Sequence, residues 1–151
     1  MLHDNCGRPA LNLRISLTQR CNLKCVYCHR EGQFPSSVMP EMTTDEVLRI
    51  ARTAVSLGMT HIKLTGGEPL LRSDIVEIVR GLAAISGLRD LAMTTNGTRL
   101  SVLAEPLREA GLRRVNINLP SLDPKTYSMV NSGDLNEALN GVGVAVKAGL
   151  H

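Results

Sequence analysis

Short apolar segments alternate four times with longer amphipathic segments along this chain, and this order limits the folds that it can adopt. Strands are predicted at four places: Leu11–Leu17, His61–Thr65, Asp90–Thr94 and Arg114–Leu119. A predicted helix follows each strand, at residues 43–57, 74–85, 101–110 and 134–148. Strands that alternate with helices pair in parallel through right-handed crossovers. The pattern therefore predicts an α/β fold, either half of a (β/α) barrel or an open parallel sheet.

The ends of the predicted helices carry their own signals. Thr43 and Glu46 have the spacing of a capping box, and Gly58 is expected to end the helix that they open. Ser73 is expected to cap the second helix, and Gly149 to end the last one.

Composition and charge narrow the functional class. At 151 residues the chain has the length of about one domain. A net charge of +3 suits an anionic small molecule and does not indicate nucleic-acid binding. No apolar run reaches the roughly 18 residues of a membrane span, and no signal peptide is evident. We therefore expect a cytoplasmic protein that binds neither membrane nor nucleic acid.

The sequence stops at His151, where a fifth strand would begin. Without that strand, residues 114–119 would form an uncovered sheet edge, which natural proteins avoid. We therefore expect residues 1–151 to be a truncated domain from a longer chain, unstable or prone to aggregate in isolation. A small complete sheet protein, or one that pairs this edge in an oligomer, is the alternative.

Four distinctive loops are predicted to converge at one rim of the fold. Each of them follows a predicted strand: residues 18–28, 66–69, 94–97 and 118–121. Ligands of parallel α/β folds collect at the carboxyl ends of the strands. Thiols, a carboxylate, amides and hydroxyls from these loops would therefore meet in one place.

The first of these loops contains Cys21, Cys25 and Cys28, with the spacing C-x3-C-x2-C. Three thiolates can hold an iron–sulfur cluster that leaves one iron open, whereas a structural zinc ion needs a fourth ligand. His29 could supply that ligand, so a zinc site is the alternative. Cys6 lies apart from the other three cysteines and is expected to be a spare thiol, with a ligand role as the alternative.

Two glycines, Gly66 and Gly67, follow the second predicted strand, and Glu68 and Pro69 come next. Glycine lets the backbone approach a ligand closely, and a carboxylate at the same turn can accept a hydrogen bond from an ammonium group. A tight turn in which Pro69 starts a helix is the alternative.

The cysteine spacing, with Tyr27 before the last cysteine, and the Gly-Gly-Glu-Pro turn together resemble the radical S-adenosylmethionine (SAM) superfamily. The resemblance implies a partial, TIM-like (β/α) barrel. It also implies that Cys21, Cys25 and Cys28 hold a [4Fe–4S] cluster whose fourth iron is chelated by SAM. One electron from the cluster would then cleave SAM to a 5′-deoxyadenosyl radical.

Further segments resemble one family within this superfamily, the GTP 3′,8-cyclases. The matching segments are Gly7–Pro9, Leu13–Thr18, Lys63–Arg72, Thr94–Gly97 and Gly111–Asn116. The resemblance implies a lyase that converts GTP to 3′,8-cyclo-7,8-dihydro-GTP at the start of molybdenum cofactor biosynthesis. It also implies an electron donor, such as a flavodoxin or a ferredoxin, and a homodimer of the full-length protein.

The resemblance assigns site roles position by position. The residues that match SAM-positioning positions are Tyr27, Gly67, Glu68 and Asn118. The residues that match GTP-contacting positions are Arg14, Lys63 and Thr94. An arginine suits a triphosphate because its guanidinium can donate two charge-assisted hydrogen bonds. A surface arginine and a strand-end hydroxyl are the plain alternatives for Arg14 and Thr94.

The chain departs from the family at several positions. Lys63 stands where the family often has arginine, so a forked contact becomes a point charge. Asn118 replaces a serine, and Pro120 replaces an acidic residue. No cysteine follows Cys28, whereas the family has a second cysteine set for another [4Fe–4S] cluster near its C-terminus. Two alternatives therefore stay open: a radical SAM enzyme with another substrate, such as a peptide or an RNA base, and a zinc-stabilised module without enzymatic activity.

Overall fold

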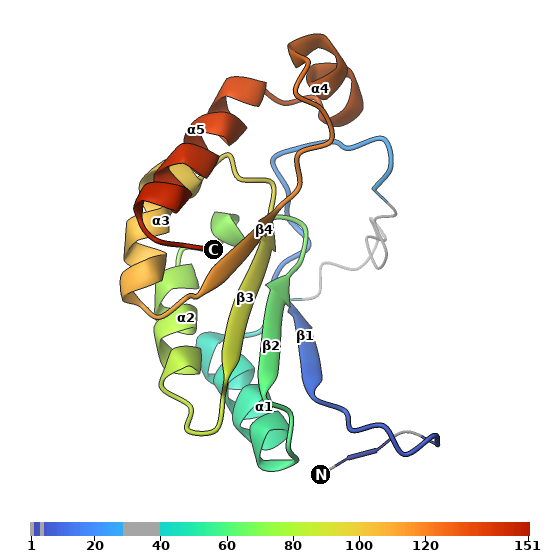
Figure 1. The fold of residues 1–151 in the computed structure, drawn as a ribbon, viewed down its shortest axis with the longest axis vertical. Coiled ribbons are helices and arrows are strands. Elements are labelled where there is room, and N and C mark those ends of the chain that lie inside the picture. Colours follow the sequence, from blue (N-terminus) through green and yellow to red (C-terminus); the bar gives the residue numbers. More distant parts are fainter. Residues whose placement is uncertain (1, 4, 29–39) are drawn as a thin grey trace.

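The computed structural model of the chain describes residues 2–3, 5–28 and 40–151. Four strands form one parallel sheet in the order β1-β2-β3-β4. They span Asn12–Ser16 (β1), His61–Thr65 (β2), Asp90–Thr95 (β3) and Arg114–Ile117 (β4). The main helices of the crossovers are α1 (Thr44–Ser56), α2 (Ile75–Ala83) and α3 (Leu100–Glu109), and α5 (Leu135–Lys147) follows the last strand (Figure 1). The predicted α/β class with a parallel sheet is confirmed.

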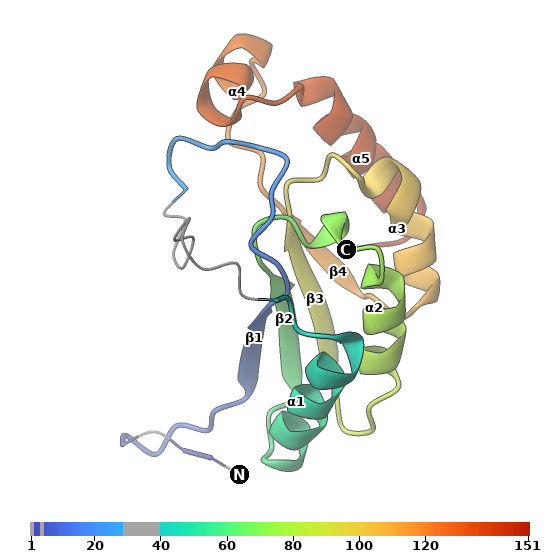
Figure 2. The same ribbon diagram turned by 180° about the vertical axis from the view of Figure 1, so that it is seen from behind.

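The hydrophobic core lies between the helices and the sheet face that they cover, which is turned toward the reader in Figure 2. Alternate strand side chains are buried on that face: Ile15, Ile62, Leu64, Leu91 and Met93. The helices contribute Val47, Ile78, Leu82 and Leu107, all fully buried. Successive strand side chains point to opposite faces, so the covered face needs an apolar residue at every second position. This requirement produces the periodicity from which the strands were predicted.

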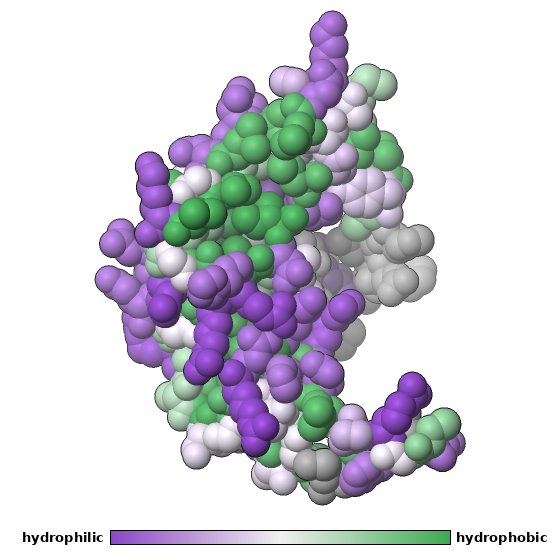
Figure 3. Space-filling view, in the orientation of Figure 1, coloured by the Kyte–Doolittle hydropathy of each residue, from purple (hydrophilic) through white to green (hydrophobic). Residues whose placement is uncertain are grey.

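The opposite face of the sheet carries polar side chains in rows that cross the strands. One row aligns Arg14, Lys63, Ala92 and Arg114. The preceding row aligns Asn12, His61 and Asp90, and the following row pairs Ser16 with Thr65 and Thr94 with Asn116. Figure 3 shows hydrophilic side chains gathered across the middle of this face. Among the described residues, no helix covers this face.

The second helix does not begin as predicted. Asp74, not Ser73, is the N-cap of α2, and it makes no capping hydrogen bond through its side chain. A 3-10 turn, Pro69–Leu71, precedes the helix, and the Asp74 carboxylate pairs with Arg72 at 2.6 Å. The predicted cap at Ser73 is therefore wrong, because this turn and this ion pair shift the start of the helix.

An additional helix that the apolar pattern does not predict, α4, spans Pro124–Asn131. Its N-cap Asp123 accepts a hydrogen bond from the Thr126 N–H at 2.8 Å, and Pro124 occupies the first turn. Both are ordinary helix-start signals. The helix is short and buries mainly Tyr127 and Asn131, which explains why no apolar periodicity indicates it.

The last residue returns to the sheet beside β4. The His151 carbonyl accepts a hydrogen bond from the Val115 N–H at 2.9 Å, and the His151 N–H donates to the Arg113 carbonyl at 3.2 Å. His151 therefore extends the backbone hydrogen bonding of the sheet beyond β4. Among the described residues, no helix is long and apolar enough to cross a membrane.

Candidate functional site

A cavity of about 570 Å³ lies at the carboxyl ends of the strands. It is bounded by the cysteine loop, residues 18–28, and by the ends of all four strands. Seven of the ten predicted site residues line it: Cys21, Cys25, Tyr27, Cys28, Gly67, Thr94 and Asn118. The predicted convergence of loops at one rim is therefore found in the structure.

The start of the cysteine loop is held by the Gly-Gly turn after β2. The Gly67 N–H donates to the Thr18 carbonyl at 2.7 Å, and the Glu68 N–H donates to the Arg20 carbonyl at 2.8 Å. A Cβ atom on Gly67 would lie 2.3 Å from the Arg20 carbonyl oxygen. A Cβ atom on Gly66, whose φ is +147°, would lie 2.5 Å from the Thr18 carbonyl oxygen. Both glycines are therefore required by the close approach of two backbones, which sets the chain entering Cys21.

The middle of the cysteine loop rests on α4. The Lys24 N–H donates to the Asn131 carbonyl at 3.0 Å, and the Val26 N–H donates to the Val130 carbonyl at 2.8 Å. These two carbonyls lie in the last turn of the helix, where they have no partner within the helix. The unpredicted helix is thus the support of the segment that carries Cys25.

The three thiols are free and face the cavity. Cys21 and Cys28 are exposed, and Cys25 is half-buried. Burial is the main cause that raises the pKa of the Cys21 thiol. Among the described residues, no three His, Cys, Asp or Glu side chains are grouped to hold one metal ion. A [4Fe–4S] cluster takes one thiolate at each of three irons, so the three thiols that line the cavity could hold such a cluster. The alternative zinc ligand, His29, lies outside the described residues.

Tyr27 and Asn118 join the cysteine loop to the end of β4. The Asn118 side-chain amide donates to the Tyr27 hydroxyl at 2.8 Å. Burial is the main cause that raises the pKa of the Tyr27 phenol, so this side chain stays neutral at physiological pH. Two residues that were predicted to position the same cofactor are thus in direct contact at the cavity wall.

Glu68 does not line the cavity, and its side chain is buried. Its carboxylate accepts three hydrogen bonds: from the Leu70 N–H at 3.0 Å, the Thr95 hydroxyl at 2.7 Å and the Asn96 N–H at 2.7 Å. Burial raises the pKa of this carboxyl, although these hydrogen bonds oppose the shift. Thr95 and Asn96 do line the cavity. Glu68 therefore holds two residues of the cavity wall by hydrogen bonds and does not itself line the cavity.

A side-chain amide inside the cysteine motif extends this network. The Asn96 amide donates to the Asn22 carbonyl oxygen at 2.8 Å, and the Asn22 amide donates to the Thr98 hydroxyl at 3.0 Å. Asn22 was not predicted as a site residue. Its position directly after Cys21 is a sequence signal for a role in the site. Sequence reasoning alone could not connect that position to Asn96, which lies 74 positions away.

A second polar network, centred on Arg72, bonds the backbone just after β1 and the backbone just before α1. Arg72 is buried and donates to the Leu17 carbonyl at 3.0 Å and to the Met42 carbonyl at 2.8 Å. It also pairs with Asp74, and the bonds from Arg72 are the main cause that lowers the pKa of Asp74 to about 2. Arg20 pairs with Glu41 at 2.8 Å beside it. The network joins the end of β1 to the approach to α1.

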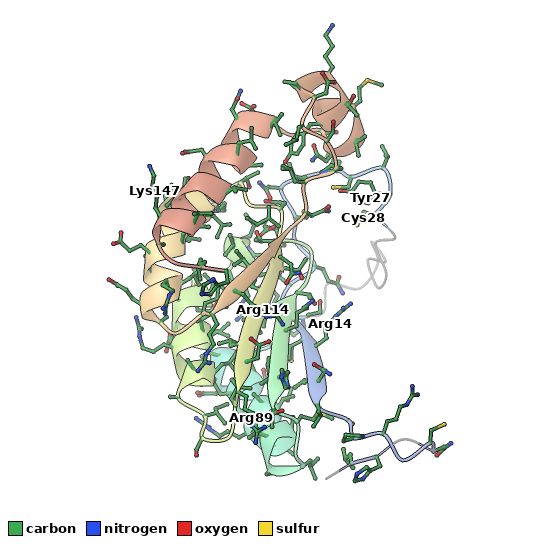
Figure 4. All side chains as sticks on the ribbon, viewed as in Figure 1. Arg14, Tyr27, Cys28, Arg89, Arg114 and Lys147 are labelled. Carbon is green, nitrogen blue, oxygen red and sulfur yellow. The ribbon has the colours of Figure 1, made fainter. Side chains whose placement is uncertain are left out.

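Arg14 and Lys63 lie outside the cavity lining, on the open face of the sheet. They are neighbours in register, two residues before Ser16 and Thr65, which do line the cavity. A strand rises about 3.3 Å per residue, so this row lies roughly 7 Å from the cavity floor. Figure 4 shows Arg14 and Arg114 on the sheet face, with Tyr27 and Cys28 beyond the ends of the strands.

Comparison with known proteins points to one superfamily. The family model described as "Radical SAM superfamily" matches residues 15–151. The protein named "Probable GTP 3',8-cyclase" from Pyrococcus horikoshii is 53% identical over 148 residues, which cover 97% of this chain and 46% of that protein. Its namesake from Pyrococcus abyssi is 52% identical over 148 residues, which cover 97% of this chain and 47% of that protein. The chain thus spans about half the length of the curated relatives that it matches.

Solved structures show a similar fold. SuiB of Streptococcus suis, bound to its precursor peptide SuiA, aligns with a TM-score of 0.78 at 21% identity over 93% of this chain and 31% of that one. SuiB bound to S-adenosylmethionine aligns with a TM-score of 0.73 at 20% identity over 93% of this chain and 30% of that one. At this level of identity the likeness establishes the arrangement of strands and helices.

Proposed function

The chain belongs to the radical SAM superfamily, and from this premise we propose that it forms the cofactor-binding part of a GTP 3′,8-cyclase. The observation that carries the proposal is the cavity in which three cysteines, Gly67 and the Tyr27–Asn118 pair converge. Relatives about 50% identical to this chain are named for that activity. The reaction would convert GTP to 3′,8-cyclo-7,8-dihydro-GTP in molybdenum cofactor biosynthesis.

The superfamily uses a [4Fe–4S] cluster and SAM, and the residues at the cavity fit both. Cys21, Cys25 and Cys28 would each bind one iron and leave the fourth open. The bound cluster and SAM would supply a one-electron cleavage that yields an organic radical. Gly67 and the Tyr27–Asn118 pair line the wall where SAM would be positioned, and Glu68 would act by holding Thr95 and Asn96 at that wall.

The substrate would lie between the cavity and the sheet face. Thr94 lines the cavity, whereas Arg14 and Lys63 lie one row deeper on the same face. A nucleotide with its sugar near Thr94 would reach the two cations with its phosphates. Neither cation has an ion pair or side-chain hydrogen bond with a described residue, so both are available to an anionic ligand. An electron donor such as a flavodoxin or a ferredoxin, a homodimer and a cytoplasmic location remain predictions.

The test uses the full-length natural protein, reconstituted anaerobically with iron and sulfide and supplied with a reductant and SAM. With GTP we expect 5′-deoxyadenosine and a cyclised guanine nucleotide in equal amounts, measured by liquid chromatography and mass spectrometry. ATP, which has the same phosphates and a different base, should yield no cyclised product. The Cys25→Ala variant should yield neither product. If GTP gave no cyclised product while another substrate class did, the superfamily would stand and the proposed substrate would be rejected.

A further inference from the structure

A row of four residues crosses the open face of the sheet, and three of them are cations. Backbone register aligns Arg14 on β1 with Lys63 on β2, Lys63 with Ala92 on β3, and Ala92 with Arg114 on β4. Arg14 and Lys63 match substrate positions in the proposed function, whereas Arg114 was assigned no role. Adjacent strands lie about 4.8 Å apart, so the backbones of Lys63 and Arg114 are separated by roughly 10 Å. Ala92 places only a methyl group between them.

Arg114 is held in a fixed position without being buried. Its Nη2 lies 2.7 Å from Oδ2 of Asp90, and its Nε lies 3.2 Å from both carboxylate oxygens. The Arg114 side chain is still 43% exposed. Its Nη1 meets the Asn116 side-chain oxygen at 3.5 Å, the outer limit of a hydrogen bond. Asp90 therefore orients the guanidinium and leaves one of its edges for a further acceptor.

The charge of the row suits a polyphosphate. Arg14, Lys63 and Arg114 carry three positive charges, and Asp90 in the neighbouring row offsets one of them. Phosphate oxygens accept strong charge-assisted hydrogen bonds, and an arginine fork can bind two of them at once. Lys63, between the two arginines along the row, adds a point charge. The row runs across the strands, so a chain of phosphates can lie along it while the sugar and the base extend toward Thr94 and the cavity.

We propose that Arg114 is a third phosphate-binding residue for the nucleoside triphosphate, acting with Arg14 and Lys63, and that Asp90 positions its guanidinium. This inference rests on the proposed function for the identity of the nucleotide. It adds a residue that fixes the phosphate end of the substrate at β4, three strands away from the cation on β1.

The test compares nucleotide binding to the full-length natural protein and its variants, measured anaerobically by isothermal titration calorimetry. Losing a hydrogen-bonded charge pair costs roughly a factor of 10 to 100 in affinity. We expect Arg114→Ala to weaken GTP binding by about this factor and guanosine binding by less than about threefold. The matched control is Arg113→Ala, which removes the same charge from an exposed neighbour outside the row and should leave GTP binding unchanged.

A second variant separates phosphate binding from the ion pair itself. Asp90→Asn removes the charge that orients Arg114 but keeps the guanidinium, so GTP binding should weaken by less than in Arg114→Ala, with guanosine binding unchanged. Equal effects of Arg114→Ala and Arg113→Ala, or equal losses for GTP and guanosine, would overturn the inference. An Asp90→Asn variant that binds GTP as tightly as the unmodified protein would reject the positioning role of Asp90. If the unmodified protein bound no GTP, the proposed function would fail instead.

Discussion

Single residues at this site either face the cavity or hold the groups that do. Glu68 belongs to the second kind, because its carboxylate accepts three hydrogen bonds from protein donors and its side chain is buried. Gly66 and Gly67 do both, because they line the cavity and also admit the backbone that leads into Cys21. The Gly-Gly-Glu sequence therefore holds the wall of the cavity in place, and any contact between this wall and a ligand depends on those internal contacts.

A pair of glycine substitutions tests this assignment. Gly67→Ala would place a Cβ atom 2.3 Å from the Arg20 carbonyl oxygen, so the turn or the cysteine loop must shift. We expect a loss of about 1–3 kcal/mol in the free energy of unfolding, as for other overpacked sites. Gly143→Ala in α5 meets no atom within 4 Å and should instead stabilise the protein by up to about 1 kcal/mol. Urea denaturation of both variants measures the difference, and equal effects would contradict the assignment.

The Arg72–Asp74 pair predicts a dependence of stability on pH. The pKa of Asp74 is lowered from an ordinary 3.8 to about 2, so its charged form is favoured in the folded state. Its contribution is therefore present above about pH 4 and is lost as the pH falls toward 2. Allowing for solvent screening, we expect Asp74→Asn to cost about 1–2 kcal/mol at pH 7, with a smaller cost below pH 4.

Urea denaturation of the Asp74→Asn variant between pH 7 and pH 3 checks this prediction. Asp45→Asn, at an exposed position in the first turn of α1, serves as the control and should change stability by less than about 0.5 kcal/mol. A difference between Asp74→Asn and the unmodified protein that stayed constant over this pH range would show that the carboxylate charge plays no part.

At the scale of elements, two supports hold the cysteine loop in place by backbone hydrogen bonds. The Gly-Gly turn bonds its start, and α4 bonds its middle. Asn22 adds a third attachment, because its amide bridges Asn96 and Thr98 at the end of β3. A loop held from three sides keeps its thiols in place before any cofactor binds, which lowers the entropy cost of binding.

Removing the attachment at β3 should loosen the loop. In Asn22→Ala we expect the thiols of the cofactor-free protein to react several-fold faster with a thiol reagent, because the loop opens more often. The iron and sulfide retained after reconstitution should fall as well. Asn140→Ala, at an exposed position on α5, is the matched control and should change neither quantity. Unaltered thiol reactivity in Asn22→Ala would show that the other two supports suffice.

At the scale of the whole molecule, the sheet is covered on one face only. Helices bury one side, the polar rows occupy the other, and β4 meets only His151 along its outer edge among the described residues. Figure 3 shows a hydrophobic area over α5 and the end of β4. Half-buried Val115 and Ile117 lie in this strand. An exposed strand edge beside apolar side chains favours association with other chains.

The polypeptide of residues 1–151, expressed without further residues, is therefore expected to self-associate. The measurement is light scattering coupled to gel filtration over a range of protein concentrations, and the average mass should rise with concentration. The full-length natural protein, compared under the same conditions, should not show this concentration-dependent growth. A stable monomer at every concentration, with cooperative thermal unfolding, would show that the edge and the apolar area are tolerated.

Much of the fold followed from local signals. The predicted β2 has the observed bounds, and α1 follows the capping box of Thr43 and Glu46, because both depend on residues a few positions apart. The loops at the strand ends could be placed at one rim because parallel strands share one direction. The short α4 was missed because its start signals at Asp123 and Pro124 lack an apolar stripe beyond them.

The sequence by itself determined the order of the elements, the thiol spacing and the resemblance that led to a family. Only the tertiary structure decided which side chains meet. Tyr27 bonds Asn118 across 91 positions, Asn22 bonds Asn96 across 74, and Glu68 accepts hydrogen bonds from Thr95 and Asn96, which line the cavity. The alignment of Arg14 with Lys63 and Arg114 also depends on strand register. The register of the strands and the convergence of their loops depend on how the helices pack against the sheet. The stabilising energy of this packing comes from contacts between distant segments rather than from any local pattern.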